Sequence, residues 1–185
     1  MNLINMDAVL RVKTTQGAGS EEIAFAIGES ALGTVLVARS AAGVCAILIG
    51  SEAAELESDL AARFTESKLV RDDRKLDDDL RKILRFIETP AEGLDLALDI
   101  RGTPFQQRVW EALLRIPTGA TVTYGALARR IGEPDAVRAV ANACAANAIA
   151  LAIPCHRVVR SNGTLSGYRW GVERKHALLA KEALA

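Results

Sequence analysis

The chain has 185 residues, of which 50% are hydrophobic and 25% charged, and its formal net charge is zero. This composition is typical of an ordinary globular protein, and the length fits one domain or two small ones. The longest apolar stretch, residues 41–49, is too short to cross a bilayer, and residues 1–20 lack the pattern of a signal peptide. We therefore expect a cytoplasmic protein without membrane contact. Three cysteines without C-x-x-C spacing argue against a disulfide framework and a cysteine-rich zinc site, and we expect neither a metal nor another cofactor.

Charge is unevenly distributed along the chain. Residues 1–95 carry 11 basic and 17 acidic side chains, whereas residues 96–185 carry 12 basic and 6 acidic ones. Such asymmetry suggests an acidic companion domain and a basic half that faces a polyanion. Simple balancing of one half by the other explains the numbers as well, so charge alone leaves both interpretations open.

The first half predicts a small α/β domain, residues 21–95, behind a flexible N-terminal tail, residues 1–20. Short runs rich in valine, isoleucine and leucine predict four strands, over residues 23–27, 34–38, 44–49 and 94–100. Apolar residues at helical spacing predict two helices, over residues 53–64 and 76–87. Asp77, Asp78 and Asp79 begin the second helix, where they complement its dipole and form a solvated face. We find no chemistry in this domain.

Residues 96–185 predict a second, mainly helical domain. Its first helix begins at Thr103–Gln106, because a threonine cap, a proline in the first turn and a glutamine three residues after the cap are typical of a helix start. Thr123 caps a second helix over residues 124–131, and a third helix runs from residue 135 to about residue 147. Two short helices separated by a Gly/Pro turn resemble a helix-turn-helix, although many helical proteins contain such pairs.

The third helix has very little side-chain bulk around one prominent cation, Arg138. Its small residues are Ala136, Ala139, Ala141, Ala143, Ala145 and Ala146. A slim helix lets its backbone approach another surface closely. A packed core and a DNA groove could both exploit this property, so the composition alone does not choose between them.

One cysteine has the surroundings of an activated nucleophile. An apolar run, residues 149–153, leads to Pro154, which restrains the backbone on both sides and presents Cys155 on a rigid turn. Three side chains that could favour the thiolate follow in the sequence: His156, Arg157 and Arg160. A buried, inert thiol is the alternative, and local residues alone leave the two interpretations about equal.

The segment around Cys155 resembles the active-site signature of the O6-alkylguanine-DNA alkyltransferases. The signature itself is residues 153–158, Ile-Pro-Cys-His-Arg-Val. Further matches lie in the correct order at residues 123–128, 137–140, 147, 163–171, 175, 178–179 and 182. The resemblance covers residues 96–185 strongly and the α/β half loosely.

The resemblance implies DNA repair by direct reversal of damage, with irreversible transfer of a methyl or larger alkyl group from O6-alkylguanine, and secondarily O4-alkylthymine, to Cys155. In this family the histidine matched by His156 takes the thiol proton through a water, and the glutamate matched by Glu182 orients that histidine. The residue matched by Asn147 would brace the active-site turn. Tyr124 would help to force the nucleotide out and would donate a hydrogen bond to the departing guanine.

The resemblance also implies how double-stranded DNA is bound. The third helix would enter the minor groove, where Ala139 and Ala145 permit close approach. Arg138 would fill the space that the flipped nucleotide leaves in the stack. The carbonyl of Val158 and the Ser166 segment would read the guanine edge.

At the level of the whole molecule, the resemblance implies an RNase H-like N-terminal α/β domain and a winged-helix-like DNA-binding domain that acts as a monomer. The product is a thioether without an activated carbonyl or phosphoryl group. Water cannot release the alkyl group from it, so one molecule repairs one lesion.

Two features depart from the family. A longer member carries an N-terminal zinc domain whose metal-bound cysteine demethylates DNA phosphates. Residues 1–95 here contain only Cys45, so we expect neither that activity nor its zinc, and we do not expect the transcriptional role that depends on them. Glu133 and Asp135 are acidic where relatives often carry neutral or basic residues, so we expect modest DNA affinity with shallow salt dependence.

Two other functions fit parts of the sequence. A sensor of alkylated bases would flip the base without transfer, but proteins of that kind lack the nucleophilic cysteine. A cysteine hydrolase would turn over repeatedly, whereas alkyl transfer stops at one equivalent. Of the other thiols, Cys144 is interpreted as a small packing residue.

Overall fold

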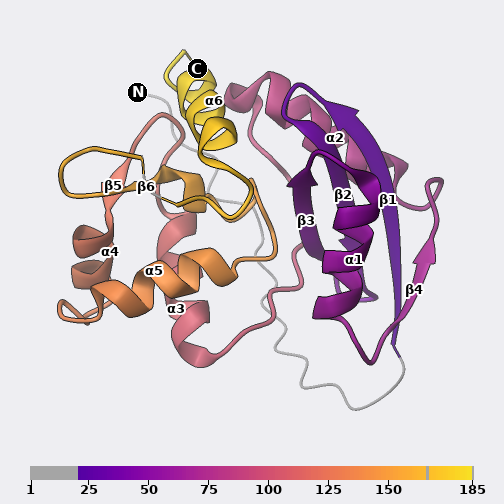
Figure 1. Ribbon diagram of the computed structural model, residues 1–185, viewed down its shortest axis with the longest axis horizontal. Coiled ribbons are helices and arrows are strands. Elements are labelled where there is room, and N and C mark those ends of the chain that lie inside the picture. Colours follow the sequence, from indigo (N-terminus) through magenta and orange to yellow (C-terminus); the bar gives the residue numbers. More distant parts are fainter. Residues whose placement is uncertain (1–20, 166, 185) are drawn as a thin grey trace. The chain divides into compact units, whose positions relative to one another are not determined.

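A computed structural model describes residues 21–165 and 167–184 (Figure 1). The chain divides after Arg101 into two compact units, each with its own core. The first is a mixed sheet with helices and the second is mainly helical, so the predicted combination of an α/β part and a helical part is confirmed.

The first unit is built on a four-stranded sheet with the order β3-β2-β1-β4. The elements, in chain order, are β1 (Glu22–Ser30), β2 (Gly33–Arg39), β3 (Val44–Gly50), α1 (Ala53–Arg63), β4 (Lys68–Arg71), α2 (Asp77–Glu88) and the short 3₁₀ helix η1 (Pro90–Glu92). Strand β2 pairs antiparallel with β1 and β3, and β4 pairs parallel with β1. Helix α1 packs on β2 and β3, and helix α2 packs on β1. The three strands and two helices predicted before residue 90 are therefore confirmed.

Three details of this unit differ from the prediction. Residues 94–100 do not form a strand: they make only an isolated bridge between Leu98 and Val44, because their backbone bonds to the edge strand β3 involve only its first residue. Strand β4, whose short pattern is half exposed, was not predicted. Asp79 does not face solvent: it is buried and accepts hydrogen bonds from Arg39 at 2.6 and 2.9 Å, whereas its two acidic neighbours are exposed as expected.

The second unit contains a cluster of three helices and a small two-stranded sheet. The elements are α3 (Pro104–Leu114), β5 (Val122–Thr123), α4 (Tyr124–Arg130), α5 (Val137–Ala146), the 3₁₀ helix η2 (Cys155–Arg157), β6 (Val158–Val159) and α6 (Val172–Glu182). Helices α3, α4 and α5 pack on one another, and β5 pairs parallel with β6. The parallel pair joins the segment before α4 to the segment after Cys155 (Figure 1).

The signals at the helix starts were accurate. The Thr103 hydroxyl accepts from the Gln106 backbone N–H, and the Gln106 side chain accepts from the Thr103 N–H, which completes the predicted capping box. Thr123 caps α4 in the same way through the N–H of Ala126. Helix α5 starts two residues later than predicted, at Val137, because residues 133–136 form a turn first.

No helix within the described residues is long and apolar enough to span a membrane.

Candidate active site

The turn before Cys155 is held by one buried amide, that of Asn147. Its Oδ1 accepts from the Ile149 N–H at 2.9 Å, and its Nδ2 donates to the Ile153 carbonyl at 2.9 Å and to the Cys155 sulfur at 3.2 Å. Leu151, inside this turn, is the single non-glycine residue with positive φ in the described part of the chain, at 67°. Such a conformation costs of order 1–3 kcal/mol and persists only where the surroundings enforce it. The turn is therefore a rigid, internally bonded mount for the sulfur.

Cys155 itself is 5% exposed and opens the short helix η2. Burial raises the pKa of its thiol to about 11, although the hydrogen bond from Asn147 and the positive charge of Lys175 act in the opposite direction. The resting side chain is consequently a thiol at neutral pH, and the site needs a base to produce the thiolate.

That base is available next to the cysteine. His156 is fully buried, and its Nε2 lies 2.8 Å from Glu182 Oε1. Burial lowers the pKa of His156, so the ring is neutral at pH 7. Because the carboxylate can only accept, Nε2 carries the hydrogen and Nδ1 carries the free lone pair. Nδ1 is buried and has no hydrogen-bond partner among the described residues, so it is able to accept a proton.

Arg157 fixes the carboxylate that holds the histidine. Its guanidinium donates to both oxygens of Glu182 and also to the Ile116 carbonyl at 2.6 Å and the Thr118 hydroxyl at 3.2 Å. Burial raises the pKa of Glu182, but the hydrogen bonds from His156 and Arg157 outweigh it and lower the pKa to about 2. Glu182 therefore stays ionised and ties α6 to the turn that follows α3.

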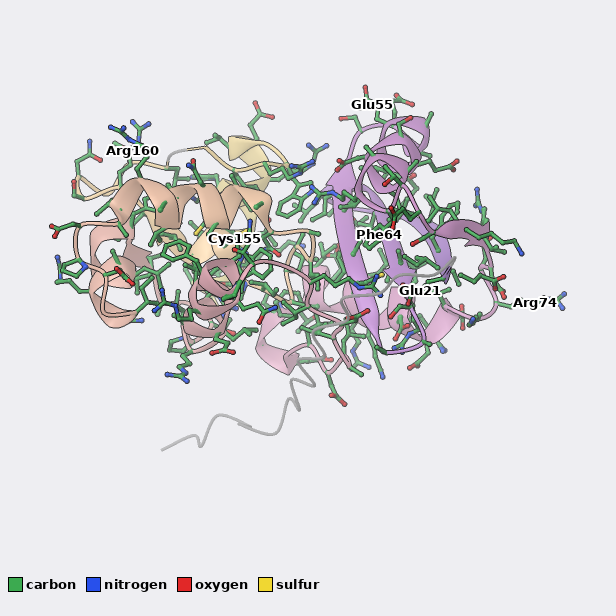
Figure 2. All side chains as sticks on the ribbon, turned by 90° about the horizontal axis from the view of Figure 1, so that it is seen from below. Glu21, Glu55, Phe64, Arg74, Cys155 and Arg160 are labelled. Atoms are coloured by element: carbon green, nitrogen blue, oxygen red, sulfur yellow. The ribbon has the colours of Figure 1, made fainter. Side chains whose placement is uncertain are left out.

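The cations expected to favour the thiolate are arranged differently from the prediction. Arg157 is engaged by Glu182, and Arg160 is exposed on the outside of the unit (Figure 2). The positive group that acts on Cys155 is instead Lys175, which is fully buried and donates to the Val158 carbonyl at 2.6 Å. Lys175 was quoted in the sequence only as part of a motif. Its spacing of seven residues from Glu182 places both on one helical face, and this signal could have identified it.

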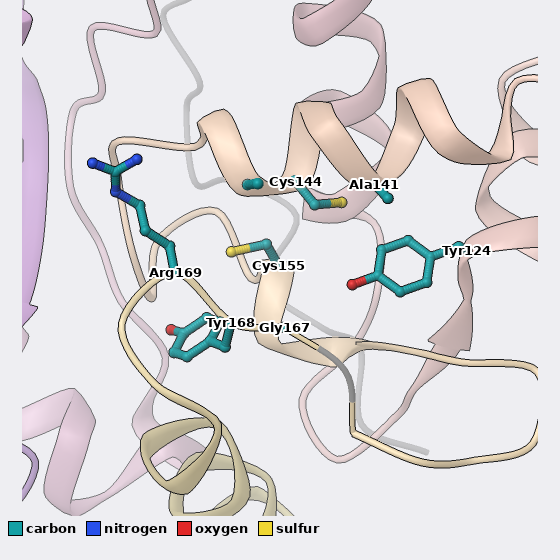
Figure 3. A pocket seen from close by; sticks show the side chains of 8 residues that line it. Tyr124, Ala141, Cys144, Cys155, Gly167, Tyr168 and Arg169 are labelled. Carbon is teal, nitrogen blue, oxygen red and sulfur yellow. The ribbon is translucent and has the colours of Figure 1, made fainter.

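Cys155 lies in a small pocket that opens on the surface of the second unit (Figure 3). The lining residues are Tyr124, Ala141, Cys144, Ala145, Cys155, Gly167, Tyr168 and Arg169. The hydroxyl end of the Tyr124 ring points toward the middle of the pocket, while Arg169 lies on the other side of Cys155 (Figure 3). The pocket thus combines a cysteine sulfur, a phenol hydroxyl and an apolar wall of α5. Tyr168 and Arg169 were not predicted as site residues.

Helix α5 uses its small residues on both faces. Val140, Ala143 and Cys144 are buried against the neighbouring helices, and the Trp110 indole donates to the Ala143 carbonyl at 2.9 Å. The opposite face exposes three residues predicted to bind DNA, Arg138, Ala139 and Ala145. The core-packing interpretation of the slim helix is therefore confirmed for one face of α5, and DNA contact by the exposed face stays a prediction.

The remaining candidates fall as follows. Val158 is buried at the start of β6, and its carbonyl accepts from Lys175. Ser166 lies outside the described residues. Cys144 is buried in the pocket wall, and burial raises the pKa of its thiol well above the ordinary value. No cluster of three or more metal-ligating side chains occurs in the described ranges.

Comparison with known proteins identifies the family. A family model described as 6-O-methylguanine DNA methyltransferase, DNA binding domain, matches residues 104–184. The methylated-DNA–protein-cysteine methyltransferase of Candida albicans is 38% identical over 161 residues, which cover 82% of this chain and 91% of that protein. This chain belongs to the methylated-DNA–protein-cysteine methyltransferase family. The predicted resemblance is confirmed.

Other members of this methyltransferase family are also similar. The Escherichia coli protein named bifunctional transcriptional activator/DNA repair enzyme Ada is 51% identical over 167 residues, which cover 89% of this chain and 47% of Ada. The chain therefore spans about half the length of that relative. The Mycobacterium tuberculosis methyltransferase OGT, solved in complex with DNA, superposes with a TM-score of 0.70 at 32% identity, covering 88% of this chain and 93% of OGT.

Proposed function

We propose that this methyltransferase repairs DNA by direct reversal, moving a methyl or larger alkyl group from O6-alkylguanine to Cys155. The observation that carries the proposal is the arrangement around one sulfur: Cys155 accepts a hydrogen bond from Asn147 and adjoins the buried His156–Glu182 pair. The names of the relatives, methylated-DNA–protein-cysteine methyltransferases, support the same reaction.

The proton leaves the sulfur before or during attack. His156 Nδ1, the ring nitrogen without a partner among the described residues, receives the Cys155 proton through a water. Glu182 accepts from Nε2 and stabilises the imidazolium that forms. The carboxylate remains ionised throughout because its pKa is about 2.

The thiolate then attacks the alkyl carbon. An S–C bond forms while the C–O6 bond of guanine breaks, and O6 keeps the bonding electrons. Tyr124, whose hydroxyl points into the pocket, donates a hydrogen bond that stabilises the leaving base, which afterwards gains one proton from water. The thioether that remains has no group for water to attack, so the reaction ends after one transfer.

The base reaches this pocket by leaving the duplex, at a cost of roughly a few kcal/mol. In the proposal the exposed face of α5 enters the minor groove, with Ala139 and Ala145 in close contact, and Arg138 occupies the vacated space. The Val158 carbonyl and the Ser166 segment read the guanine edge. Binding of DNA is supported by the solved complex of the related OGT with DNA.

We infer that the first unit is RNase H-like and the second winged-helix-like; the boundary predicted at residue 95 lies six residues before the division after Arg101. The protein acts as a monomer in the cytoplasm, and O4-alkylthymine is a secondary substrate. The absence of the zinc-dependent activity and of the transcriptional role remains a prediction.

The decisive experiment is mass spectrometry after mixing the protein with duplex DNA containing O6-methylguanine. We expect one added methyl group per protein, on the peptide that contains Cys155. Cys155→Ala should lose transfer but still bind the modified duplex. Cys144→Ser, altered in the same pocket wall, is the matched control and should transfer at nearly the parent rate.

The same experiment separates the rival functions, which the family membership does not favour. A sensor would bind the modified duplex and leave the sulfur unchanged. A cysteine hydrolase would process many equivalents of an ester or peptide and end unmodified. Either result would overturn the proposal.

A further inference from the structure

A buried hydroxyl in the Cys155 pocket, that of Tyr168, has no role in the proposed transfer. Tyr168 lies in the loop between β6 and α6, lines the pocket and is 7% exposed as a residue. Its hydroxyl oxygen is buried and has no hydrogen-bond partner within residues 21–165 and 167–184. A buried polar group without a partner costs free energy, so native proteins nearly always supply one, in many cases an ordered water.

The ring next to Tyr168 contains a second buried atom of this kind. His156 Nδ1 also lacks a hydrogen-bond partner among the described side chains and backbone. The rings of Tyr168 and His156 meet edge to face, with centroids 6.4 Å apart and an interplanar angle of 76°. The Tyr168 ring also contacts Trp170 edge to face, with centroids 5.1 Å apart. These two contacts hold the ring, and therefore its hydroxyl, in a fixed place beside the imidazole.

The same hydroxyl shares the pocket with the Cys155 sulfur. In Figure 3 the hydroxyl end of Tyr168 and the sulfur of Cys155 are directed to the same side of the view, away from Tyr124. Burial raises the pKa of Tyr168 well above its ordinary value, and the negative charge of a Cys155 thiolate raises it further. The phenol therefore keeps its proton at neutral pH and is able to donate a hydrogen bond.

We propose that the Tyr168 hydroxyl holds the water through which Cys155 gives its proton to His156, so that Tyr168 is a positioning residue for the transfer. This inference rests on the proposed function and adds a residue to the same site. A buried water makes about three hydrogen bonds. Here it accepts from the Cys155 S–H and the Tyr168 O–H, and it donates to His156 Nδ1. One water thereby satisfies both unpartnered atoms.

The water passes the proton on and is itself unchanged. As the sulfur gives its proton to the water oxygen, another proton of the same water moves to His156 Nδ1, and the water then donates to the thiolate. Tyr168 keeps its own proton throughout. Its hydrogen bond makes the water a stronger donor, because hydrogen bonds in a chain polarise one another. The hydroxyl thus favours the pair of Cys155 thiolate and His156 imidazolium, which is the state that attacks the alkyl carbon.

Other titratable and charged groups surround these atoms and affect the parent and a Tyr168 variant alike. Glu182 stays ionised because its pKa is about 2, and burial raises the pKa of the Cys144 thiol. Burial lowers the pKa of Lys175. The ratio of the parent rate to the variant rate therefore isolates the hydroxyl. The full set around the relay is Tyr124, Cys144, Arg157, Arg169, Arg174, Lys175 and Glu182.

The test compares Tyr168→Phe with the parent in single-turnover methyl transfer from O6-methylguanine in duplex DNA. The replacement removes the hydroxyl and keeps the ring that contacts His156 and Trp170. At about pH 7 we expect transfer to be slower by about fivefold, the effect of one hydrogen bond. The difference should shrink as the pH is raised toward about 9, because hydroxide then generates the thiolate directly and the relay contributes less.

Tyr124→Phe makes the same chemical change in the same pocket and is the matched control. Tyr124 is proposed to act on the leaving base and not on the thiol proton. Its loss should therefore slow transfer by the same factor from about pH 6 to about pH 9. If the difference from the parent narrows equally in both variants, Tyr168 has no special connection with the thiol proton and the inference is wrong.

The free energy of unfolding gives a readout that needs no activity. A hydroxyl left without a partner destabilises the fold, whereas one bonded to a water does not, so Tyr168→Phe should be no more stable than the parent. The inference is overturned by a more stable variant, by an unchanged rate at about pH 7, or by slowing that is the same at every pH. Failure of the parent protein to accept a methyl group would instead reject the proposed function, and it is measured separately.

Discussion

Three buried ionisable side chains meet beside Cys155, and the loss of any one of them would lower the free energy of unfolding. His156, Arg157 and Glu182 are each no more than 7% exposed, and they are linked by bonds of 2.8–3.2 Å. Removing one partner of a buried pair leaves the other charge without compensation, at a cost of about 3–5 kcal/mol. These three side chains therefore also stabilise the fold.

The Glu182→Gln variant tests this coupling through pH. The pKa of Glu182 lies near 2 in the folded protein and at 4.5 ordinarily, so its ionisation stabilises the fold above about pH 4.5, and this contribution is lost as the pH falls toward 2. At pH 7 the free energy of unfolding should fall by about 3 kcal/mol in the variant. The difference from the parent should narrow between pH 5 and 3 in urea titrations.

Glu173→Gln, on the exposed face of the same helix, is the matched control and should unfold like the parent at every pH. A difference between Glu182→Gln and the parent that stays constant down to pH 3 would contradict the ionised, bonded state assigned to this carboxylate.

Local sequence identified part of the site and missed the part that depends on distant contacts. Cys155 and His156 are neighbours in the chain, so their proximity was predictable, and Asn147 lies one short turn away. Resemblance, not local pattern, was needed to add Glu182 from the far end of α6. Arg157 and Asp79 were misinterpreted because their partners, Glu182 and Arg39, lie 25 and 40 residues away.

At the scale of elements, predictions succeeded where the signal is local. A capping box and an apolar stripe lie within one or two helical turns, so α3 and α4 were predicted closely. Whether residues 68–71 and residues 94–100 form strands depends on which edge of the sheet is available for pairing. Short apolar runs do not carry that information.

The exposed face of α5 leads to a prediction about base extrusion. Arg138→Ala should slow transfer from O6-methylguanine in duplex DNA, by roughly tenfold for a lost contact of about 1.4 kcal/mol. Transfer from free O6-benzylguanine should change much less, because the free base needs no extrusion. Comparing single-turnover rates on the two substrates measures the effect.

Arg115→Ala changes another exposed arginine, at the end of α3, and should affect neither rate. If Arg138→Ala slows transfer equally on both substrates, Arg138 does not act in base extrusion.

At the scale of the whole molecule, charge separates along the chain in the same way as structure. Residues 1–95 have a net negative charge and include the helices and strands of the first unit. Residues 96–185 have a net positive charge and include the pocket and α5. The separation was visible in the sequence, but its meaning was not, because either half could have balanced the other. The pocket lies in the basic half, and in the proposed function this half faces DNA.

We expect the acidic turn before α5 to limit how strongly residues 96–185 bind DNA. Glu133 pairs with Arg108 at 3.1 Å, and Asp135 is exposed. We expect the affinity for undamaged duplex to fall with salt at a logarithmic slope of about −3, corresponding to roughly three phosphate contacts. Fluorescence anisotropy at salt concentrations from about 50 to about 200 mM measures the slope.

Replacing both carboxylates, Glu133→Gln with Asp135→Asn, should raise the affinity at every salt concentration. A parent slope steeper than about −6 would mean that many more phosphates are contacted than this surface suggests.

The buried, protonated state of Cys155 affects how readily the sulfur undergoes side reactions before a substrate is bound. With a thiol pKa of about 11, only a very small fraction of the molecules carries the thiolate at pH 7. Oxidants and soluble electrophiles consume cysteines mainly through that form. In the proposed function Cys155 reacts only once, so its protonated state preserves it until an alkylated base reaches the pocket.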